Sequence, residues 1–238
     1  SRTVERLLDA VADAPATRGF GAALSGADRL TVISEIKRRS PSKGDLYADL
    51  DPAVMARTYE RGGASCLSVL TDTAHFGGSV ADLHAARQAC SLPVLRKDFT
   101  VSPLDVVDAR LMGADCVLLI SAALDRTELV DFHQLADEIG LDVLVEIHDE
   151  AELELALAAN ARLIGVNQRD LVTFRVDHER AERMATVIPD DAVKVAESGV
   201  RDGADARRLR AAGYDAVLVG ETLVTSDDPA AAIGELTG

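Results

Sequence analysis

The stretch MGADCVLLI, residues 112–120, joins the end of a helix to a buried strand. Gly after the last helical turn is a common left-handed helix stop, and a short unbroken apolar run is typical of a parallel strand covered on its outer face. The pattern, with Gly or Ala at the stop, recurs in GGASCLSVL (62–70), AANARLIGVN (158–167) and AAGYDAVLVG (211–220). One helix-to-strand unit is therefore repeated along the chain.

Extending this pattern in both directions gives eight expected strands in a chain of 238 residues. They lie near 31–37, 65–70, 93–97, 115–120, 142–147, 162–167, 192–197 and 215–219. Helix starts are signalled between them by Asp51-Pro52, Ser102-Pro103 and Ser79 with Asp82 three residues on. Eight alternating units favour an α/β fold, a closed (βα)8 barrel, over an open doubly wound sheet. Because no linker or break in composition appears, we expect one domain over residues 1–238.

The segment before the first strand has a different character. Val4, Leu7, Leu8 and Val11 recur at helical spacing, and Phe20–Leu24 has the pattern of a short helical turn. We expect residues 1–30 to form a short N-terminal helical extension that closes one end of the core.

The charge balance limits the classes of partner. Asp and Glu number 40 against 25 Lys and Arg, for a net charge of −15. This disfavours nucleic acid and anionic membranes as partners. Scarce lysine with abundant aspartate fits adaptation to high salt, and a GC-rich genome would give the same composition. The surface that this composition predicts is compatible with a monomer or a homodimer.

The cysteine pattern and the lack of a long apolar run suggest the compartment in which the protein works. Cys66, Cys90 and Cys116 have no metal-ligand spacing, so we expect reduced thiols. None of them ends a strand near other ionisable groups, which disfavours a catalytic cysteine. We see neither an apolar run long enough to span a bilayer nor a secretory signal, and we therefore expect a cytoplasmic protein.

Ionisable residues gather where the expected strands end. In TVISEIKRRSPSKG (31–44), Glu35 and Lys37 share a strand face with Ile33, and charges that face a core are costly unless they pair or react. Further polar residues follow the third, fifth, sixth and seventh strands at Lys97, Glu146, Asn167 and Glu197. In a (βα)8 barrel these carboxyl ends meet at one mouth, where the active site lies.

The loops after the last two strands predict a phosphate site. They read ESGV and VGETL, in which Gly199 and Gly220 allow close backbone approach and Ser198 and Thr222 offer hydroxyl donors. Glu221 would lie awkwardly beside a phosphate, so we expect only its backbone to face the ligand.

Two strand-end residues have the chemistry of proton transfer. Lys97 is either a partly desolvated general acid or a surface lysine paired with Asp98, and Glu146 is either its proton-transfer partner or half of a structural ion pair. Phe76 is expected to line an apolar pocket. No GxGxxG or P-loop pattern and no metal-ligand spacing appears, so neither a cofactor nor a metal is predicted.

Six blocks in this order resemble the indole-3-glycerol phosphate synthase family of tryptophan biosynthesis. They are SEIKRRSPSKG (34–44), PVLRKDF (93–99), LVEIHDEAEL (144–153), IGVNQRDLVTF (164–174), VAESGV (195–200) and VLVGETLV (217–224). The resemblance implies a lyase that acts without cofactor or metal. It would close the pyrrole ring of 1-(2-carboxyphenylamino)-1-deoxyribulose 5-phosphate and expel CO2 and water.

The resemblance also implies roles for individual residues. Lys97 would protonate the ketose oxygen, and Lys37 would hold the carboxylate that leaves. Glu35 and Glu146 would share the later acid–base steps, in an order left open. Asn167 would contact the substrate hydroxyls, and Glu197 a hydroxyl or a lysine. The substrate and its phosphate would be bound by Ser40, Arg169, Ser198, Gly199, Gly220 and Thr222. The aromatic ring would lie against Phe76, Phe99 and Leu171.

Some features depart from the family pattern, and two other functions remain to be weighed. Gln168 and Thr222 stand where the family usually has Asn and Ser, and the N-terminal extension is short. A phosphoribosylanthranilate isomerase would want Cys and Asp at the ends of the first and fourth strands, where this chain has Glu35 and Ile120. A barrel that only binds a phosphorylated metabolite would not need Lys37, Lys97 and Glu146 together.

Overall fold

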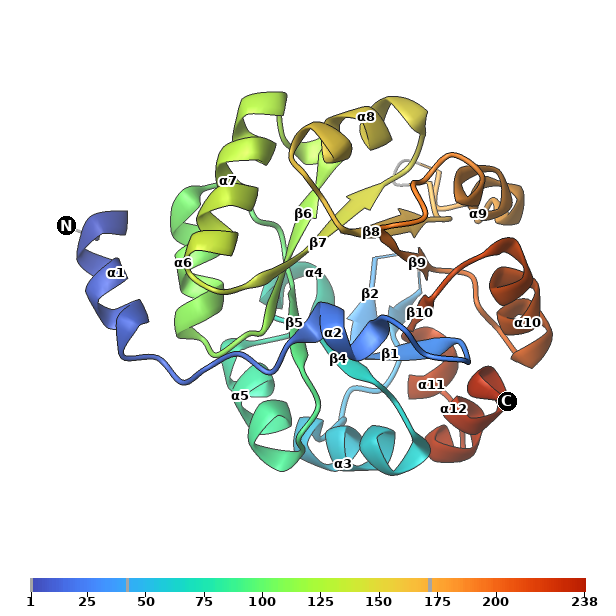
Figure 1. Ribbon diagram of the computed structural model, residues 1–238. Helices are drawn as coiled ribbons and strands as arrows, with labels where there is room; N and C mark the ends of the chain where they lie inside the picture. Colours follow the sequence, from blue (N-terminus) through green and yellow to red (C-terminus); the bar gives the residue numbers. More distant parts are fainter. Residues whose placement is uncertain (1, 42, 171–172) are drawn as a thin grey trace.

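A computed structural model describes residues 2–41, 43–170 and 173–238. Eight parallel strands close into one barrel, and helices surround it (Figure 1). In barrel order the strands are β1 (Thr31–Ile36), β4 (Cys66–Leu70), β5 (Val94–Lys97), β6 (Cys116–Ile120), β7 (Asp142–Ile147), β8 (Leu163–Asn167), β9 (Val193–Glu197) and β10 (Ala216–Val219). The predicted (βα)8 barrel is confirmed, with each strand within one residue of its expected bounds.

Helices cover the outside of the barrel. They are α3 (Pro52–Gly62), α5 (Val80–Ala89), α6 (Pro103–Leu111), α7 (Arg126–Glu138), α8 (Glu150–Ala158), α9 (His178–Ala185), α10 (Gly203–Ala212) and α12 (Pro229–Thr237). Asp51, Ser79 and Ser102 accept backbone N–H groups of the first turns of α3, α5 and α6, so these three helices begin where the sequence signals predicted. Short elements near the mouth are β2 (Arg39–Ser40), β3 (Gly44–Asp45), α4 (Thr73–Phe76), η1 (Ser121–Ala123) and α11 (Glu221–Val224).

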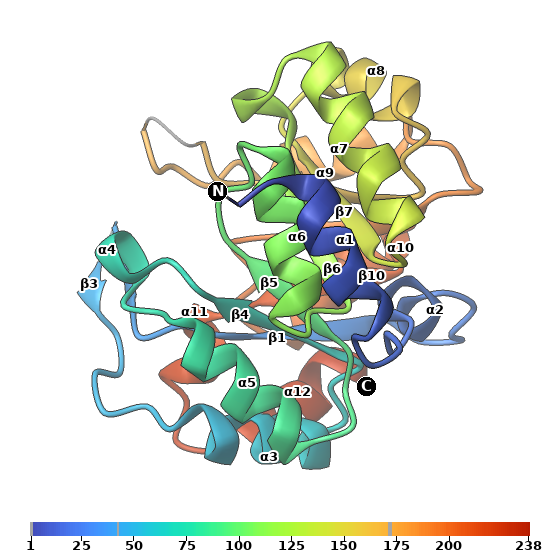
Figure 2. The same ribbon diagram turned by 90° about the vertical axis from the view of Figure 1, so that its left-hand side faces the viewer.

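The N-terminal extension closes the floor of the barrel, as predicted. Phe20 and Leu24 on α2 (Phe20–Leu24) are fully buried and pack on the side chains inside the barrel. The backbone N–H of Gly21 donates to Asp142 at 2.9 Å, and that of Arg18 donates to Asp115 at 2.8 Å. Helix α1 (Val4–Ala12) lies against α6 on the outside of the ring (Figure 2). Asp115 and Asp142, at the amino ends of β6 and β7, therefore hold the N-terminal extension in place and have a structural role.

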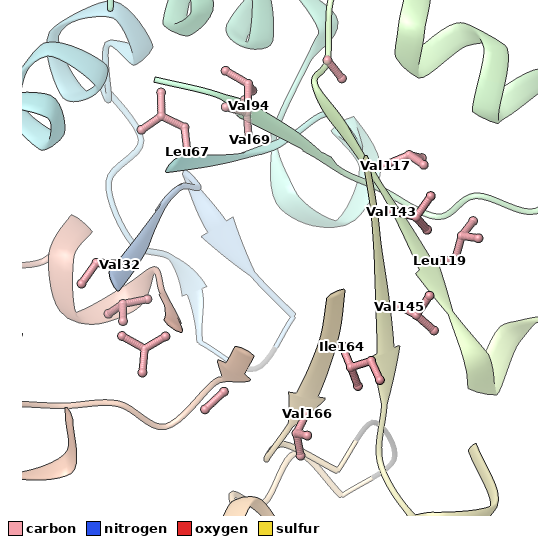
Figure 3. Packing of buried hydrophobic residues seen from close by; sticks show 14 of the residues in the cluster. Val32, Leu67, Val69, Val94, Val117, Leu119, Val143, Val145, Ile164 and Val166 are labelled. Carbon is pink, nitrogen blue, oxygen red and sulfur yellow. The ribbon is translucent and has the colours of Figure 1, made fainter. Parts of the chain in front are cut away.

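Alternation along the strands divides the core into two apolar layers. Outward-facing side chains such as Val32, Val117 and Val145 pack beneath the helices (Figure 3). Inward-facing side chains such as Ile33 and Leu144 fill the barrel. Both faces of each strand are covered, which is why the strands read as continuous apolar runs.

The three cysteines are free thiols, as expected. Cys66 and Cys116 are buried inside the barrel, and burial raises the pKa of both thiols far above the ordinary range. Such thiols are unreactive. None of the helices in the described part of the chain has the length and apolarity that crossing a membrane requires.

Candidate active site

The charged residues at the mouth continue the inward-facing rows of the strands. On β1 the row is Ile33 and then Glu35, and Lys37 follows at the strand end. On β7 the row is Leu144 and then Glu146. The predicted sharing of one face by Ile33, Glu35 and Lys37 is therefore confirmed.

Four of these residues form one level inside the barrel. Glu35, Lys97, Glu146 and Glu197 come from β1, β5, β7 and β9, which are alternate strands of the ring. Inward side chains of alternate strands stack in layers of four, and such layers are ordinarily apolar. Here one layer contains three carboxyl groups and one ammonium group, and each of the four side chains lines the cavity above it.

Lys97 is the centre of this layer. Its Nζ donates to Glu146 Oε2 at 2.8 Å and to Glu197 Oε2 at 3.0 Å. Burial disfavours the ammonium form, but the charges of the neighbouring carboxylates outweigh it and raise the pKa of Lys97. Lys97 is therefore protonated in the free site. The alternative pairing with Asp98 is wrong, because Asp98 accepts from Arg96 and Thr71 instead.

The two carboxylates that share Lys97 differ in their surroundings. Glu146 Oε1 also accepts from Asn167 at 3.0 Å. Burial favours the neutral acid, but Lys97 and Asn167 outweigh it and lower the pKa of Glu146. Glu197 Oε1 is buried with no hydrogen-bond partner among the described residues, and burial raises the pKa of Glu197 to about 7. The layer thus holds one firmly ionised carboxylate beside one that can carry a proton at neutral pH.

Asn167 connects the acid–base layer to the turn after β9. While its amide donates to Glu146, its Oδ1 accepts from Ser198 Oγ at 2.9 Å and from the Arg169 backbone N–H at 3.0 Å. Ser198 and Gly199 have φ values of 66° and 76°. A Cβ on Gly199 would lie 2.5 Å from Val176. The turn therefore requires glycine there, and it presents its backbone to the cavity.

Glu35 and Lys37 form a second charged pair. Lys37 Nζ lies 2.5 Å from Glu35 Oε1, and both side chains are largely buried at the mouth. A Cβ on Gly220 would lie 2.4 Å from the same Glu35 oxygen. Gly220 thus makes room for Glu35, a role beyond the predicted approach to a phosphate.

One residue of the site was missed from the sequence. Gly165 lies in the middle of β8, and a Cβ there would lie 2.1 Å from Glu197 Oε1. The layer can hold Glu197 only because this position has no side chain. A glycine inside a strand often marks close approach, so LIGVN contained the signal.

A cavity of about 520 Å³ lies above the layer. Leu171 lies outside the described residues, and every other candidate residue lines the cavity: Glu35, Lys37, Ser40, Phe76, Lys97, Phe99, Glu146, Asn167, Arg169, Glu197, Ser198, Gly199, Gly220 and Thr222. This volume is in the range of sites for small metabolites. Within the described ranges, no cluster of three His, Cys, Asp or Glu side chains could hold a metal.

The rim has further residues that the sequence did not single out. Lys43, Phe174 and His178 also line the cavity. The Lys43 ammonium bonds the Glu221 carboxylate, so the side chain of Glu221 turns toward a lysine. The Thr222 hydroxyl donates to the Val200 carbonyl at 2.7 Å and is already engaged.

The barrel and its charged mouth define a (βα)8-barrel enzyme. Solved structures of similar fold include 3-hexulose-6-phosphate synthase from Salmonella typhimurium (TM-score 0.70, 16% identity, 87% of this chain and 96% of that one). Another is thiamine phosphate pyrophosphorylase from Pyrococcus furiosus (TM-score 0.65, 18% identity, 87% and 93%). At such identities the likeness shows the fold alone.

Sequence relatives settle the family. The indole-3-glycerol phosphate synthase family model matches residues 2–236. Relatives of that name are 52% identical in Streptomyces griseus (98% of this chain, 87% of the relative) and 52% identical in Micrococcus luteus (96% and 87%). The chain belongs to the indole-3-glycerol phosphate synthase family, and it is a carboxy-lyase of tryptophan biosynthesis. The isomerase and the metabolite-binding barrel are thereby set aside.

Proposed function

We propose that the mouth of this barrel converts 1-(2-carboxyphenylamino)-1-deoxyribulose 5-phosphate into indole-3-glycerol phosphate, with Lys97 as the general acid. The supporting observation is the buried Lys97 ammonium, which is held between Glu146 and Glu197 directly below the cavity. A protonated group in that position can deliver a proton as charge develops on the ketose oxygen. The substrate is thus a phosphorylated small molecule.

The two anionic ends of the substrate need separate places. We assign its carboxylate to Lys37 and its phosphate to the turns after β9 and β10, where Ser198, Gly199 and Gly220 line the cavity. Backbone N–H groups at such turns are suited to phosphate. Arg169, Ser40 and Thr222, the last through its backbone because its hydroxyl bonds Val200, complete that shell in our proposal.

The aromatic ring of the substrate needs an apolar wall. Phe76 and Phe99 line the cavity, and Phe99 is 48% exposed at its rim. We assign these two rings, with Leu171, to the carboxyphenyl group. Burial of a partly exposed phenyl ring by the substrate would add apolar contact at the rim.

The chemistry follows in three balanced steps. The ring carbon that bears the carboxylate attacks the ketose carbon, and Lys97 protonates the oxygen to a hydroxyl. The C–CO2 bond then breaks, and its electron pair restores the benzene ring. Finally the hydroxyl leaves as water after protonation by an acid, and a base removes a proton from the CH2 beside the nitrogen. We assign the final acid–base pair to Glu35 and Glu146, Asn167 to the sugar hydroxyls and Glu197 to holding Lys97.

Glu35→Gln and Glu146→Gln test this division of labour. We expect each variant to lower the rate of indole formation about a hundredfold or more, as loss of a general acid or base does. Single-turnover CO2 release should continue in a variant that is blocked only at dehydration. Indole fluorescence and CO2 release, recorded on the same sample, separate the two steps. If Glu35→Gln and Glu146→Gln both formed indole and released CO2 at the native rates, the assignment would be refuted.

Ser198→Ala tests the phosphate turn. The Ser198 hydroxyl belongs to the turn assigned to the phosphate, and it is linked to Glu146 only through Asn167, so its loss should weaken substrate and transition state nearly equally. We expect KM to rise about tenfold while kcat changes less than twofold. A fall in kcat at constant KM would show that the turn acts on the transition state.

We further propose that residues 1–238 act as one domain, as a monomer in the cytoplasm. The apolar layer between strands and helices continues around the whole barrel, which supports one domain. The free thiols support a reducing compartment. Light scattering of the purified protein would test the monomer.

A further inference from the structure

His148 lies two residues beyond Glu146 and directly after the last residue of β7. Its side chain is 11% exposed, so the ring is almost enclosed. The ring Nε2 is buried, has no hydrogen-bond partner among the described residues and lies 3.8 Å from Glu146 Oε1. A buried ring nitrogen left beside a catalytic carboxylate requires an explanation.

The other side of the ring is fixed by α8. Asp149 caps this helix and accepts from the backbone N–H of Glu152, which lies in the first turn. Glu152 Oε2 in turn lies 2.8 Å from the backbone N of His148 and 3.0 Å from its Nδ1. The carboxylate therefore accepts from both groups, and Nδ1 carries a hydrogen. In a neutral ring Nε2 would then direct a lone pair toward Glu146, whereas in a protonated ring it directs an N–H.

The charges around the ring favour the protonated form. Glu146 faces it from β7, Glu152 from α8 and Arg180 from α9. Burial and Arg180 disfavour a charged ring, but the Glu152 hydrogen bond and the two carboxylates outweigh them, so the pKa of His148 is raised above its ordinary value.

We infer that His148 is a positioning residue for Glu146: its protonated ring, held by Glu152, supplies a second cation that keeps the Glu146 carboxylate ionised and oriented when Lys97 turns to the substrate. This inference rests on the proposed role of Glu146. In the free site Lys97 Nζ holds Glu146 Oε2 and Asn167 holds Oε1. Once Lys97 protonates the ketose oxygen, Lys97 loses its charge. A charged donor near Oε1, the oxygen that Lys97 does not contact, then keeps the pKa of Glu146 low.

A pH dependence follows with a definite sign. Protonated His148 is the active form, so kcat is full below the pKa of His148 and falls as the pH rises through it. Loss of the Glu152 charge lowers the pKa of His148, so the fall moves to lower pH. Glu197 also titrates near neutral pH and could give the pH profile of kcat a limb of its own. Glu152 contacts His148 and not Glu197, so removal of the Glu152 charge shifts the limb only if the limb belongs to His148.

The test compares pH profiles of kcat and KM for three single variants. His148→Asn keeps a donor near the Nδ1 position and loses Nε2, whereas His148→Gln places a donor near Nε2, and neither titrates. We expect the limb that belongs to His148, which is the one that Glu152→Gln moves, to vanish in both, with kcat at pH 6.5 about tenfold lower in His148→Asn, the effect of one pKa unit on an acid–base group. KM should change less than twofold. Glu152→Gln should keep the full plateau and move the limb to lower pH.

Several outcomes would overturn the inference. One is an alkaline limb with the native midpoint in all three variants, and another is native kcat in His148→Asn across the pH range. If His148→Asn unfolds, His148→Gln and Glu152→Gln decide the question. Failure here is separable from failure of the proposed function: native activity in Glu146→Gln would refute the role of Glu146, whereas an inactive Glu146→Gln beside a normal His148→Asn refutes only the role of His148.

Discussion

Lys97→Met is expected to lower kcat by about a thousandfold or more, within the range that positioned general acids supply. Methionine fills a similar volume but has no proton to give, and ring closure is the first step. CO2 release and indole formation should therefore be lost together, unlike in a variant blocked only at dehydration. Retention of CO2 release would show that another group protonates the ketose oxygen.

The same variant leaves two buried carboxylates without their shared cation. Removing one partner of a buried ion pair costs roughly 3–5 kcal/mol when the remaining charge cannot be neutralised. Glu197 can take up a proton, because burial already raises its pKa to about 7 and loss of Lys97 removes an influence that lowers this pKa. The folded variant then holds a proton that the unfolded chain releases, so we expect its stability relative to the native protein to fall from pH 6 to pH 8. Chemical unfolding at the two pH values measures this difference.

Lys194→Met is the matched control. Lys194 is also a buried lysine, but it faces the helices, where its Nζ donates to the Ala185 carbonyl at 3.1 Å and to Asp190 at 3.2 Å. Its loss should lower stability and leave kcat within about twofold, since Lys194 does not line the cavity and its Nζ contacts no member of the charged layer. Equal losses of kcat in the two variants would mean that Lys97 is structural.

The barrel could be predicted because its signals are local. Each strand is a short apolar run, and each strand end places polar residues at the mouth within a few positions. Lys97 and Glu146 were predicted to lie at the mouth by the same argument, because each ends an apolar strand. The short hairpin β2–β3 and the helix α4 were not predicted, because elements of two to four residues have too few positions to show a period.

Spacing alone could not choose between the alternative partners of Lys97, because closure of the barrel decides which side chains meet. Lys97 and Glu197 are 100 residues apart in sequence, and Asp98 is next to Lys97, so sequence proximity favoured the wrong pair. Only the layering of alternate strands brings Glu146 from β7 and Glu197 from β9 to Lys97 on β5. His148 was likewise not singled out from the sequence, because its burial depends on α8 and α9.

Gly165→Ala should separate the geometry of this layer from its chemistry. The new Cβ would lie 2.1 Å from Glu197 Oε1, which is the far end of a side chain, and 3.2 Å from Leu144 Cδ1. Glu197 can rotate away, so we expect a small loss of stability, about 1 kcal/mol for a crowded core methyl group. Displacement of Glu197 also displaces Lys97, and a misplacement of about 1 Å can cost about a hundredfold in rate. We expect kcat to fall by about that factor.

Two comparisons make the Gly165 prediction decisive. Gly234→Ala, in α12, adds a methyl group where nothing lies within 4 Å, and it should leave kcat unchanged. Glu197→Ala removes the carboxylate that Gly165 accommodates. If Gly165 acts through Glu197, adding Gly165→Ala to Glu197→Ala should lower kcat no further, because the two changes act on one contact. Additive losses would mean instead that the methyl group disturbs the layer through Leu144, and the close approach of β8 to Glu197 would have no part in catalysis.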